Sequence, residues 1–270
     1  MSNNTLPIGV FDSGVGGLTV AREIFRNLPN EKIIYFGDTA RVPYGNKSKE
    51  TIIRYSKQIA NFLLTQNVKA IVVACNTASA LALHELKDSL DIPVMGVVEP
   101  GAKAASIVTK NNRIGVIGTE GTVSSGLYND ILDQIKPGCE IFSQACPLFV
   151  SLVEEGMIDD EVTITMIHRY LDEMIEKDDI DTLILGCTHY PLLRTIIRRE
   201  IGEGINLVNP AYETANALKA LLESKGLASD TPCSFNDHQF FVSDGALRFQ
   251  RFAEEIAELN ITNTKLKILE

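Results

Sequence analysis

The sequence Ala70-Ile71-Val72-Val73-Ala74-Cys75-Asn76-Thr77 places a cysteine directly after a short run of aliphatic residues. The sequence Thr182-Leu183-Ile184-Leu185-Gly186-Cys187-Thr188-His189 repeats this arrangement in the second half of the chain. Each aliphatic run has the length and composition of a buried strand, and residues with helical spacing follow each cysteine. Both cysteines are therefore expected where a strand ends and a helix begins. Ligands bind at this edge of an open α/β sheet, so Cys75 and Cys187 are candidate functional groups.

Other apolar runs alternate with segments of helical spacing along the whole chain. Strands are predicted at residues 8–11, 32–37, 70–74, 94–97, 113–118, 140–143, 182–186, 206–208 and 239–242. Helices are predicted at residues 17–28, 49–66, 78–90, 100–109, 121–135, 161–177, 191–200, 212–224 and 247–259. This alternation is typical of an α/β fold with mainly parallel sheets that helices cover on both faces.

A weak internal repeat indicates two related halves. Ile8-Gly9-Val10 opens the first strand and Ile114-Gly115-Val116 opens a later one, at a spacing similar to that of the two cysteines. The alternative is that Ile-Gly-Val is simply a common strand opening. We expect two pseudo-symmetric α/β lobes with the active site in the cleft between them. Prolines that follow apolar strands mark the crossovers, which predicts a first lobe of residues 1–98 plus 210–270 and a second of residues 99–209.

Composition indicates a soluble globular protein without a nucleic-acid or membrane partner. The 270 residues are 45% apolar and 22% charged, with a net charge of −10 and a pI of about 5.0. The densest basic cluster, at residues 194–199, is interpreted as a solvated helix face. No apolar run is long enough to span a membrane, and the first residues lack the regions of a signal peptide. Five cysteines without regular spacing do not indicate a disulfide framework, so a cytoplasmic location with free thiols is expected.

Two loops at predicted strand ends contain groups suited to a small anion. Asp12-Ser13-Gly14-Val15-Gly16-Gly17 follows the first strand, and its glycines allow tight turns with exposed N–H groups, as in a carboxylate-binding loop. Pro43-Tyr44-Gly45 lies in the loop after the second strand and offers backbone N–H groups and a phenol. Each loop alone is also compatible with an ordinary strand–helix turn. Asp12 and Ser13 favour a functional role for the first loop, because a simple turn needs neither.

Polar residues at the same strand ends can either cap the following helices or bind the carboxylate and ammonium groups of an amino acid. These residues are Asn76, Thr77, Thr119, Thr122, Thr188 and His189. His189 is close enough to Cys187 to tune its protonation or to relay a proton. No metal is expected, because Cys75, Cys187 and His189 lack the close pairs of zinc sites. No lysine stands out as a pyridoxal phosphate anchor, so no cofactor is predicted.

Two thiols that face one cavity can invert a stereocentre. One thiolate removes a proton from one face of a carbon atom, and the opposite thiol returns a proton to the other face. The pKa of a free cysteine is about 8.5, and the positive end of a helix dipole favours the thiolate. We therefore expect a helix N-terminus and a nearby polar group to bring the pKa of each thiol toward neutrality.

Four motifs together resemble those of the glutamate racemase family, cofactor-independent bacterial enzymes that make D-glutamate for peptidoglycan. The motifs are Gly-Val-Phe-Asp-Ser-Gly-Val-Gly-Gly-Leu-Thr-Val at 9–20, Tyr-Phe-Gly-Asp-Thr-Ala-Arg-Val-Pro-Tyr-Gly at 35–45, Val-Ala-Cys-Asn-Thr-Ala-Ser-Ala at 73–80 and Leu-Gly-Cys-Thr-His-Tyr-Pro at 185–191. The resemblance spans nearly the whole chain. It implies two α/β lobes, the first built from both ends of the chain, and a homodimer that acts on glutamate.

The resemblance also implies roles for individual residues. Cys75 would deprotonate D-glutamate and Cys187 would deprotonate L-glutamate. The implied catalytic residues are Cys75, Cys187, Asp12, His189 and Glu154. The implied substrate contacts are Asp12, Ser13, Tyr44, Gly45, Asn76, Thr77, Thr119, Thr122, Thr188 and His189.

Several alternatives remain open at this point. Glu155 is the neighbour of Glu154, and either carboxylate fits the assisting position that some family members use. A racemase of the same kind could act on aspartate or another amino acid, because the sequence does not measure pocket size. A non-catalytic amino-acid binder with buried cysteines and a redox protein with a reversible disulfide are rivals of other classes.

Overall fold

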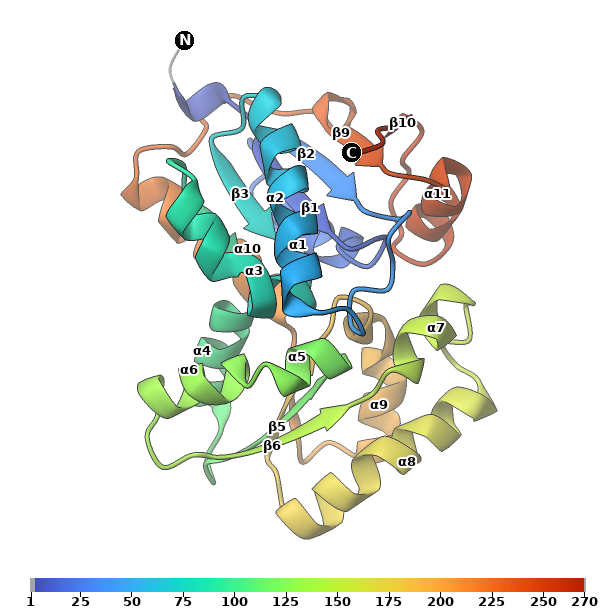
Figure 1. Cartoon of the computed structure of the whole chain (residues 1–270). Coiled ribbons are helices and arrows are strands. Elements are labelled where there is room, and N and C mark those ends of the chain that lie inside the picture. Colours follow the sequence, from blue (N-terminus) through green and yellow to red (C-terminus); the bar gives the residue numbers. More distant parts are fainter. Residues whose placement is uncertain (1–2, 270) are drawn as a thin grey trace.

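The computed structural model describes residues 3–269, and the ten strands within this range form two separate sheets (Figure 1). The first sheet has the strand order β10-β9-β2-β1-β3-β4. Its strands are β1 (Ile8–Asp12), β2 (Ile33–Gly37), β3 (Ala70–Val73), β4 (Val94–Gly96), β9 (Gln239–Val242) and β10 (Thr264–Leu266). We call this sheet with its helices the first unit.

The second sheet has the strand order β6-β5-β7-β8. Its strands are β5 (Arg113–Gly118), β6 (Glu140–Ala145), β7 (Thr182–Gly186) and β8 (Asn206–Val208). Every strand pair in both sheets is parallel. The predicted α/β fold with mainly parallel sheets is therefore confirmed, and we call this second sheet with its helices the second unit.

Helices separate most consecutive strands, as parallel pairing requires. The α-helices are α1 (Leu18–Asn27), α2 (Lys49–Thr65), α3 (Asn76–Ser89), α4 (Val98–Val108), α5 (Glu120–Ser124), α6 (Leu127–Ile135), α7 (Leu148–Glu154), α8 (Glu161–Asp178), α9 (Arg194–Ile201), α10 (Pro210–Ser224) and α11 (Ala246–Glu255). Short 3₁₀ turns are η1 (Asn3–Thr5), η2 (Tyr190–Leu193) and η3 (Phe235–Asp237). Among residues 3–269, no helix has the length and apolar character needed to cross a membrane.

The central strands are buried on both faces, which explains why they read as continuous apolar runs. Side chains of β1 and β3 alternate between two cores, with Val10 and Val72 in one and Phe11 and Ile71 in the other. Helices α1, α10 and α11 contribute to the first of these cores, and α2 and α3 contribute to the second. The core around Val10 continues into the second unit, where it includes Leu185. The two units therefore share one continuous hydrophobic core.

The chain passes from the first sheet to the second through α4 and returns through α10. Helix α10 packs against both α1 and α4, so the two crossovers lie side by side. Strands from both ends of the chain build the first sheet, whereas the second uses only the middle of the sequence. Because α4 and α10 contact strands of the second unit, sheet membership alone does not set the lobe limits, and the division at 98/99 and 209/210 remains a proposal.

Two of the predicted helices are interrupted. The stretch 121–135 forms α5 and α6 instead of one helix, because Gly126 between them has a left-handed backbone with φ of 69°. After Cys187, the 3₁₀ turn η2 with its Pro191 delays α9 to Arg194. Cys75, in contrast, is the N-cap residue of α3. The two cysteines are thus similar in their strands but not in the helices that follow.

Two observed elements were absent from the sequence prediction. Helix α7 has only seven residues and lacks a side-chain N-cap, so it has few of the signals that predict a helix. Strand β10 has three largely exposed residues at the edge of the first sheet. Neither element is long enough to show a hydrophobic period, although α7 proves important for the site.

Candidate active site

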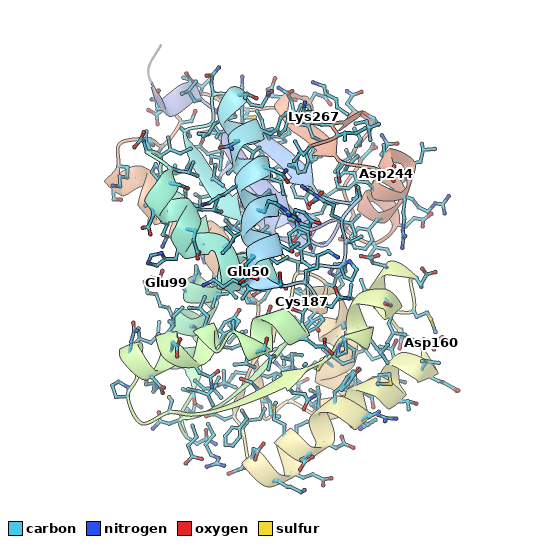
Figure 2. All side chains as sticks on the ribbon, in the orientation of Figure 1. Glu50, Glu99, Asp160, Cys187, Asp244 and Lys267 are labelled. Carbon is cyan, nitrogen blue, oxygen red and sulfur yellow. The ribbon has the colours of Figure 1, made fainter. Side chains whose placement is uncertain are left out.

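The carboxyl ends of strands from both sheets face one cavity of about 170 Å³. Ser13 follows β1, Cys75 follows β3, Thr119 follows β5 and Cys187 follows β7, and all four residues line the cavity. Figure 2 shows Cys187 at the junction of the two units, whereas Asp160, Asp244 and Lys267 lie on the outside. The topology therefore brings together strand ends that are far apart in sequence.

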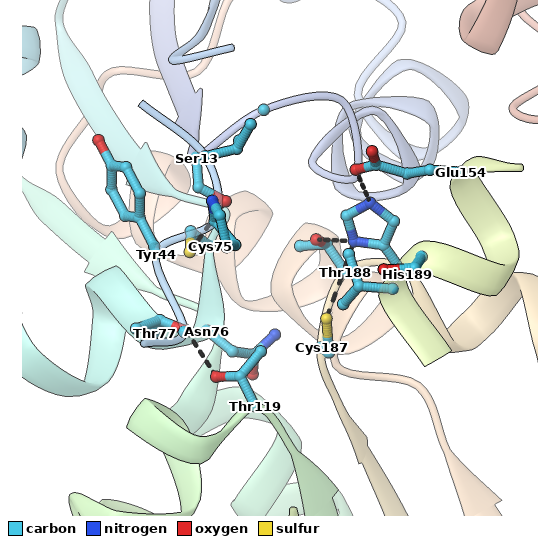
Figure 3. Close-up of a pocket in the computed structure, with 16 residues that line it drawn as sticks. Ser13, Tyr44, Cys75, Asn76, Thr77, Thr119, Glu154, Cys187, Thr188 and His189 are labelled. Atoms are coloured by element: carbon cyan, nitrogen blue, oxygen red, sulfur yellow. Dashed lines mark hydrogen bonds and ion pairs between the residues drawn. The ribbon is translucent and has the colours of Figure 1, made fainter. Parts of the chain in front are cut away.

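Most of the predicted site residues line this cavity (Figure 3). They are Ser13, Tyr44, Gly45, Cys75, Asn76, Thr77, Thr119, Glu154, Cys187, Thr188 and His189. Two predicted residues, Asp12 and Thr122, are buried and do not line it. Five lining residues were not predicted, namely Gly14, Val42, Pro43, Val150 and Ser151. Gly14, Val42 and Pro43 belong to the two quoted loops, whereas Val150 and Ser151 lie on the unpredicted helix α7.

Cys75 is held at the N-terminus of α3. Its sulphur accepts a hydrogen bond from the backbone N–H of Ala78 at 3.4 Å, and the thiol donates to Ser13 Oγ at 3.6 Å. Burial raises the pKa of the Cys75 thiol to about 12, and the nearby charge of Asp12 adds to this effect. The contacts with Ala78 and Ser13 lower the pKa, but by less. The expectation that the helix N-terminus would bring this pKa toward neutrality is therefore wrong, since desolvation outweighs the helix.

The raised pKa predicts that Cys75 reacts slowly with iodoacetamide at neutral pH, because only the thiolate is nucleophilic. In a Cys187→Ser variant, the alkylation rate of Cys75 should still be rising at pH 10, with no plateau near pH 8. Mass spectrometry of the peptide that contains Cys75 measures this rate, and circular dichroism confirms that the protein stays folded. A plateau below pH 8 would contradict the burial argument.

Asp12, the last residue of β1, is completely shielded from solvent. Its Oδ2 accepts a hydrogen bond from the backbone N–H of Gly14 at 2.9 Å, while Oδ1 has no hydrogen-bond partner among the described residues. Burial raises the pKa of Asp12, and the charge of His189 and neighbouring backbone N–H groups oppose this rise. Asp12 therefore shapes the electrostatics around Cys75 from outside the cavity.

Cys187 has a different environment, because a line of polar side chains extends from it. Cys187 Sγ lies 3.8 Å from His189 Nδ1, and His189 Nε2 lies 2.9 Å from Glu154 Oε1 (Figure 3). Burial acts to lower the pKa of His189, but the contacts with Cys187 and Glu154 outweigh it and raise the pKa to about 10. These contacts favour the protonated form of the imidazole opposite the sulphur of Cys187. The two thiols therefore differ in their neighbours, since Cys75 has the Asp12 carboxyl nearby and Cys187 has the His189 ring.

Geometry distinguishes the two candidate glutamates. The side chain of Glu154 is 21% exposed and contacts His189, whereas that of Glu155 is 71% exposed and, among residues 3–269, has only Arg248 within ion-pair distance, at 3.7 Å. Burial acts to raise the pKa of Glu154, but His189 and Arg248 together lower it. Glu154 is therefore the carboxylate that can act on the Cys187 side.

Three threonines connect the two units at the floor of the cavity. Thr77 Oγ1 of the first unit lies 2.8 Å from Thr119 Oγ1 and 3.4 Å from Thr122 Oγ1 of the second. Thr119 and Thr122 are themselves 3.1 Å apart. Thr122 does not line the cavity, but its hydroxyl lies within hydrogen-bond distance of the hydroxyls of Thr77 and Thr119.

Two glycines allow other parts of the units to approach closely. A Cβ atom at Gly16 would lie 2.3 Å from Thr188 Oγ1 and 2.5 Å from the ring of His189. A Cβ atom at Gly45 would lie 2.7 Å from Thr119 Cβ, and the Gly45 carbonyl accepts a hydrogen bond from Gly121 N at 2.8 Å. Any side chain at these positions would push the units apart at the cavity, so both loops need glycine there.

Tyr44 lines the cavity in a different way from that expected. Its hydroxyl donates a hydrogen bond to Asp38, which also pairs with Arg41 at 2.7 Å and accepts from Ser243 Oγ at 2.9 Å. The phenol therefore faces away from the cavity (Figure 3). Tyr44 contributes its ring and backbone, and the expectation of an available phenol is wrong.

Asn76 has its orientation set by a tyrosine of the second unit. The hydroxyl of Tyr128, on α6, donates a hydrogen bond to Asn76 Oδ1 at 2.9 Å, and both side chains are buried. Because the amide oxygen is occupied, the two N–H groups of the amide remain as the donors that Asn76 can offer. The sequence did not indicate Tyr128, which lies far from Asn76 along the chain and in no recognisable motif.

All five cysteines are free thiols, with Cys75 and Cys187 among the buried ones. Within residues 3–269, no three His, Cys, Asp or Glu side chains are grouped so that they could hold a metal ion. The chemistry that this arrangement offers is proton transfer by two buried thiols in unlike environments.

Comparison with known proteins places this site in a family. The model of the Asp/Glu/Hydantoin racemase family matches residues 8–218. The chain is 53% identical to the glutamate racemase of Geobacter metallireducens over 244 residues, which cover 90% of each chain. Its fold is similar to that of the glutamate racemase isoform RacE1 from Bacillus anthracis, with a TM-score of 0.94, 42% identity and 98% of each chain covered.

A glutamate racemase from Francisella tularensis, solved in complex with D-glutamate, is similar as well. Its TM-score is 0.91 at 36% identity, with 99% of each chain covered. Sequence and fold therefore agree over nearly the full length of these relatives. The chain belongs to the Asp/Glu/hydantoin racemase family and, within it, to the glutamate racemases.

Proposed function

We propose that this protein interconverts L-glutamate and D-glutamate without a cofactor, with Cys75 and Cys187 as the two acid/base groups. The observation that carries the proposal is that both thiols line one pocket, from the ends of β3 and β7. The relatives named above supply the choice of glutamate as substrate.

The two environments suit opposite halves of the reaction. With L-glutamate bound, the thiolate of Cys187 takes the α-proton, and the electron pair of the broken C–H bond stays on a planar carbanion. The thiol of Cys75 then donates its proton to the opposite face, which leaves D-glutamate and a Cys75 thiolate. The raised pKa of Cys75, which favours its thiol form, and the contact of His189 with Cys187 suit this direction. D-glutamate reacts by the same steps in reverse.

The thiols need further help to reach an ordinary enzymatic rate. A turnover of about 10 s⁻¹ requires the barrier of the uncatalysed reaction to be lowered to about 16 kcal/mol, and positioned acid/base groups supply only about 3–5.5 kcal/mol of that lowering. The rest is electrostatic stabilisation of the substrate carboxylate, on which negative charge develops in the carbanion. We assign this role to the donors around the pocket: Ser13, the Tyr44–Gly45 backbone, Asn76, Thr77 and Thr188.

Replacing Tyr128 with phenylalanine tests the role of the Asn76 amide. Loss of the hydroxyl leaves Asn76 Oδ1 without its partner, so the amide can turn this oxygen toward the substrate carboxylate. We expect the KM for glutamate to rise about tenfold, with a smaller change in kcat. Tyr190→Phe is the matched control, because Tyr190 donates to the Gly118 and Cys146 carbonyls instead. Equal KM values for both variants would contradict the assigned role.

Incubation of L-glutamate with the enzyme in D₂O, without added cofactor, tests the proposed reaction. We expect D-glutamate that carries deuterium at the α-carbon, detected by NMR and by chiral chromatography. L-aspartate in a parallel sample should react much more slowly. Absence of both deuteration and inversion of glutamate would refute the proposal, and faster reaction of aspartate would reassign the substrate.

The resemblance to glutamate racemases extends the proposal to the cell. D-glutamate from this reaction would supply peptidoglycan synthesis, and the enzyme would act in the cytoplasm as a homodimer. Light scattering in solution measures the oligomeric state directly.

A further inference from the structure

Glu154 is the point where the two units meet beside the Cys187 thiol. It is the last residue of α7 in the second unit, whereas Arg248 lies on α11 in the first unit. Arg248 Nη2 lies 3.2 Å from Glu154 Oε2, and Glu154 Oε1 lies 2.9 Å from His189 Nε2. The carboxylate of Glu154 thus has a different partner on each oxygen.

Two partners fix the orientation of a carboxylate, because rotation about its C–C bond breaks one contact or the other. The oxygen that faces His189 accepts from Nε2–H, which leaves the Nδ1 side of the ring facing Cys187 Sγ at 3.8 Å. The contact with Arg248 also helps to keep Glu154 ionised against the effect of burial, as required for an acceptor that serves His189. Without Arg248, Glu154 would depend on His189 alone.

Water-accessible space surrounds this contact. Glu154 lines not only the pocket of the two thiols but also two neighbouring cavities of about 290 and 160 Å³, and Arg248 lines both of these. A carboxylate with open space on two sides can adopt other rotamers unless a specific contact holds it. The side chain of Arg248 is 67% exposed, so the pair adds little to folding stability. The contact with Arg248 is instead expected to set the orientation of the Glu154 carboxylate.

We propose that Arg248 is a positioning residue that holds Glu154, and through it the ring of His189, in the orientation that faces Cys187. The inference rests on the proposed two-thiol reaction and adds a role for the C-terminal helix α11. The expected effect is confined to the Cys187 thiol. The contacts of Arg248 lead through Glu154 and His189 to Cys187, and none of those described leads to Cys75. Arg248 therefore acts on proton transfer at one face of the substrate, from outside the pocket.

The test is the kinetics of Arg248→Gln with glutamate deuterated at the α-carbon. We expect kcat to fall about three- to fivefold with little change in KM. With L-glutamate, Cys187 breaks the C–D bond, so the slowed step increases the primary isotope effect. With D-glutamate, Cys75 breaks that bond and Cys187 acts afterwards, so the isotope effect decreases. General damage to the fold would change both directions alike.

Three companion variants make the result decisive. Arg251→Gln removes an arginine one turn further along α11 that lines the larger neighbouring cavity but makes no ion pair with Glu154 in the described structure, and it should behave as the wild type. Arg248→Lys should restore part of the activity, since it keeps the charge. In a Glu154→Gln background, Arg248→Gln should have no further effect.

Isotope effects that change in the same sense in both directions, or the same loss with Arg251→Gln, would overturn the role of Arg248. The wild-type protein is assayed in parallel in D₂O. Failure of the wild type to invert glutamate would refute the proposed function itself, and the two failures are thereby distinguished.

Discussion

Cys187→Ser is expected to abolish racemisation but to leave α-proton exchange of D-glutamate in D₂O. Cys75 is intact in this variant, so at alkaline pH, where a thiolate forms despite the raised pKa, it can still remove the α-proton of D-glutamate and return a deuteron to the same face. Cys75→Ser should show the mirror result, with exchange of L-glutamate only. A serine hydroxyl is far less acidic than a thiol and cannot replace it, so racemisation should fall at least about 10³-fold in each variant. NMR follows exchange, and chiral chromatography follows inversion.

The loss must appear in both directions of each variant. L-glutamate and D-glutamate have equal free energies, so kcat/KM for the two directions must stay equal whichever thiol is removed. The asymmetry is therefore confined to exchange without inversion, which identifies the face that each thiol serves. Cys233→Ser is the control, because Cys233 lies outside the pocket and should leave both readouts unchanged. Racemisation that survives in either pocket variant would contradict a two-thiol mechanism.

Lys69→Met is expected to lower the free energy of unfolding more than any other substitution proposed above. Lys69 Nζ lies 2.5 Å from Glu31 Oε2 and donates to the carbonyls of Asn4 and Leu227, at 2.6 and 2.7 Å. Glu31 Oε1 accepts from Ser229 N at 2.8 Å. The side chains of Lys69 and Glu31 are 1% and 4% exposed, so the substitution leaves a buried carboxylate without its counter-charge.

We expect the free energy of unfolding to fall by about 3–5 kcal/mol and the Tm to fall by about 10 °C. The ion pair joins the segments before β2 and β3 to the chain after α10, at the end of the sheet opposite the pocket. The KM of the folded enzyme should therefore change little. Differential scanning calorimetry measures the effect, and Lys177→Met is the matched control because its pair with Glu173 is exposed. A similar loss of stability in the control would show that burial does not set the cost.

The positions of the central strands were well predicted from sequence because those strands are buried on both faces. Every residue of Thr182–Gly186 is buried, so the strand appears in the sequence as an apolar run without a polar face. The same reasoning fails for α7 and β10, which are too short to show a period, and for the break at Gly126, where a backbone conformation decides. Local pattern therefore predicts the central layers of the fold better than its edges.

Local pattern predicted the site mainly where its residues adjoin a strand end, whereas Glu154, on α7, followed only from the resemblance to the family. Cys75 and Cys187 carry the same local signal, and the topology brings both to one pocket. Arg248 and Tyr128 act on the site across the two units and have no motif, so only coordinates reveal them. The pKa of Cys75 was expected to fall because the helix is visible in the sequence, whereas the desolvation that raises it depends on how the units close.

The structure of the enzyme with glutamate bound tests the central claim most directly. Two sulphur atoms must flank one stereocentre if the thiols exchange its proton between faces. The account predicts that Cys75 Sγ and Cys187 Sγ each lie about 3–3.5 Å from the α-carbon, on opposite faces of it. Two sulphurs on the same face, or one separated from the α-carbon by protein atoms, would contradict the account.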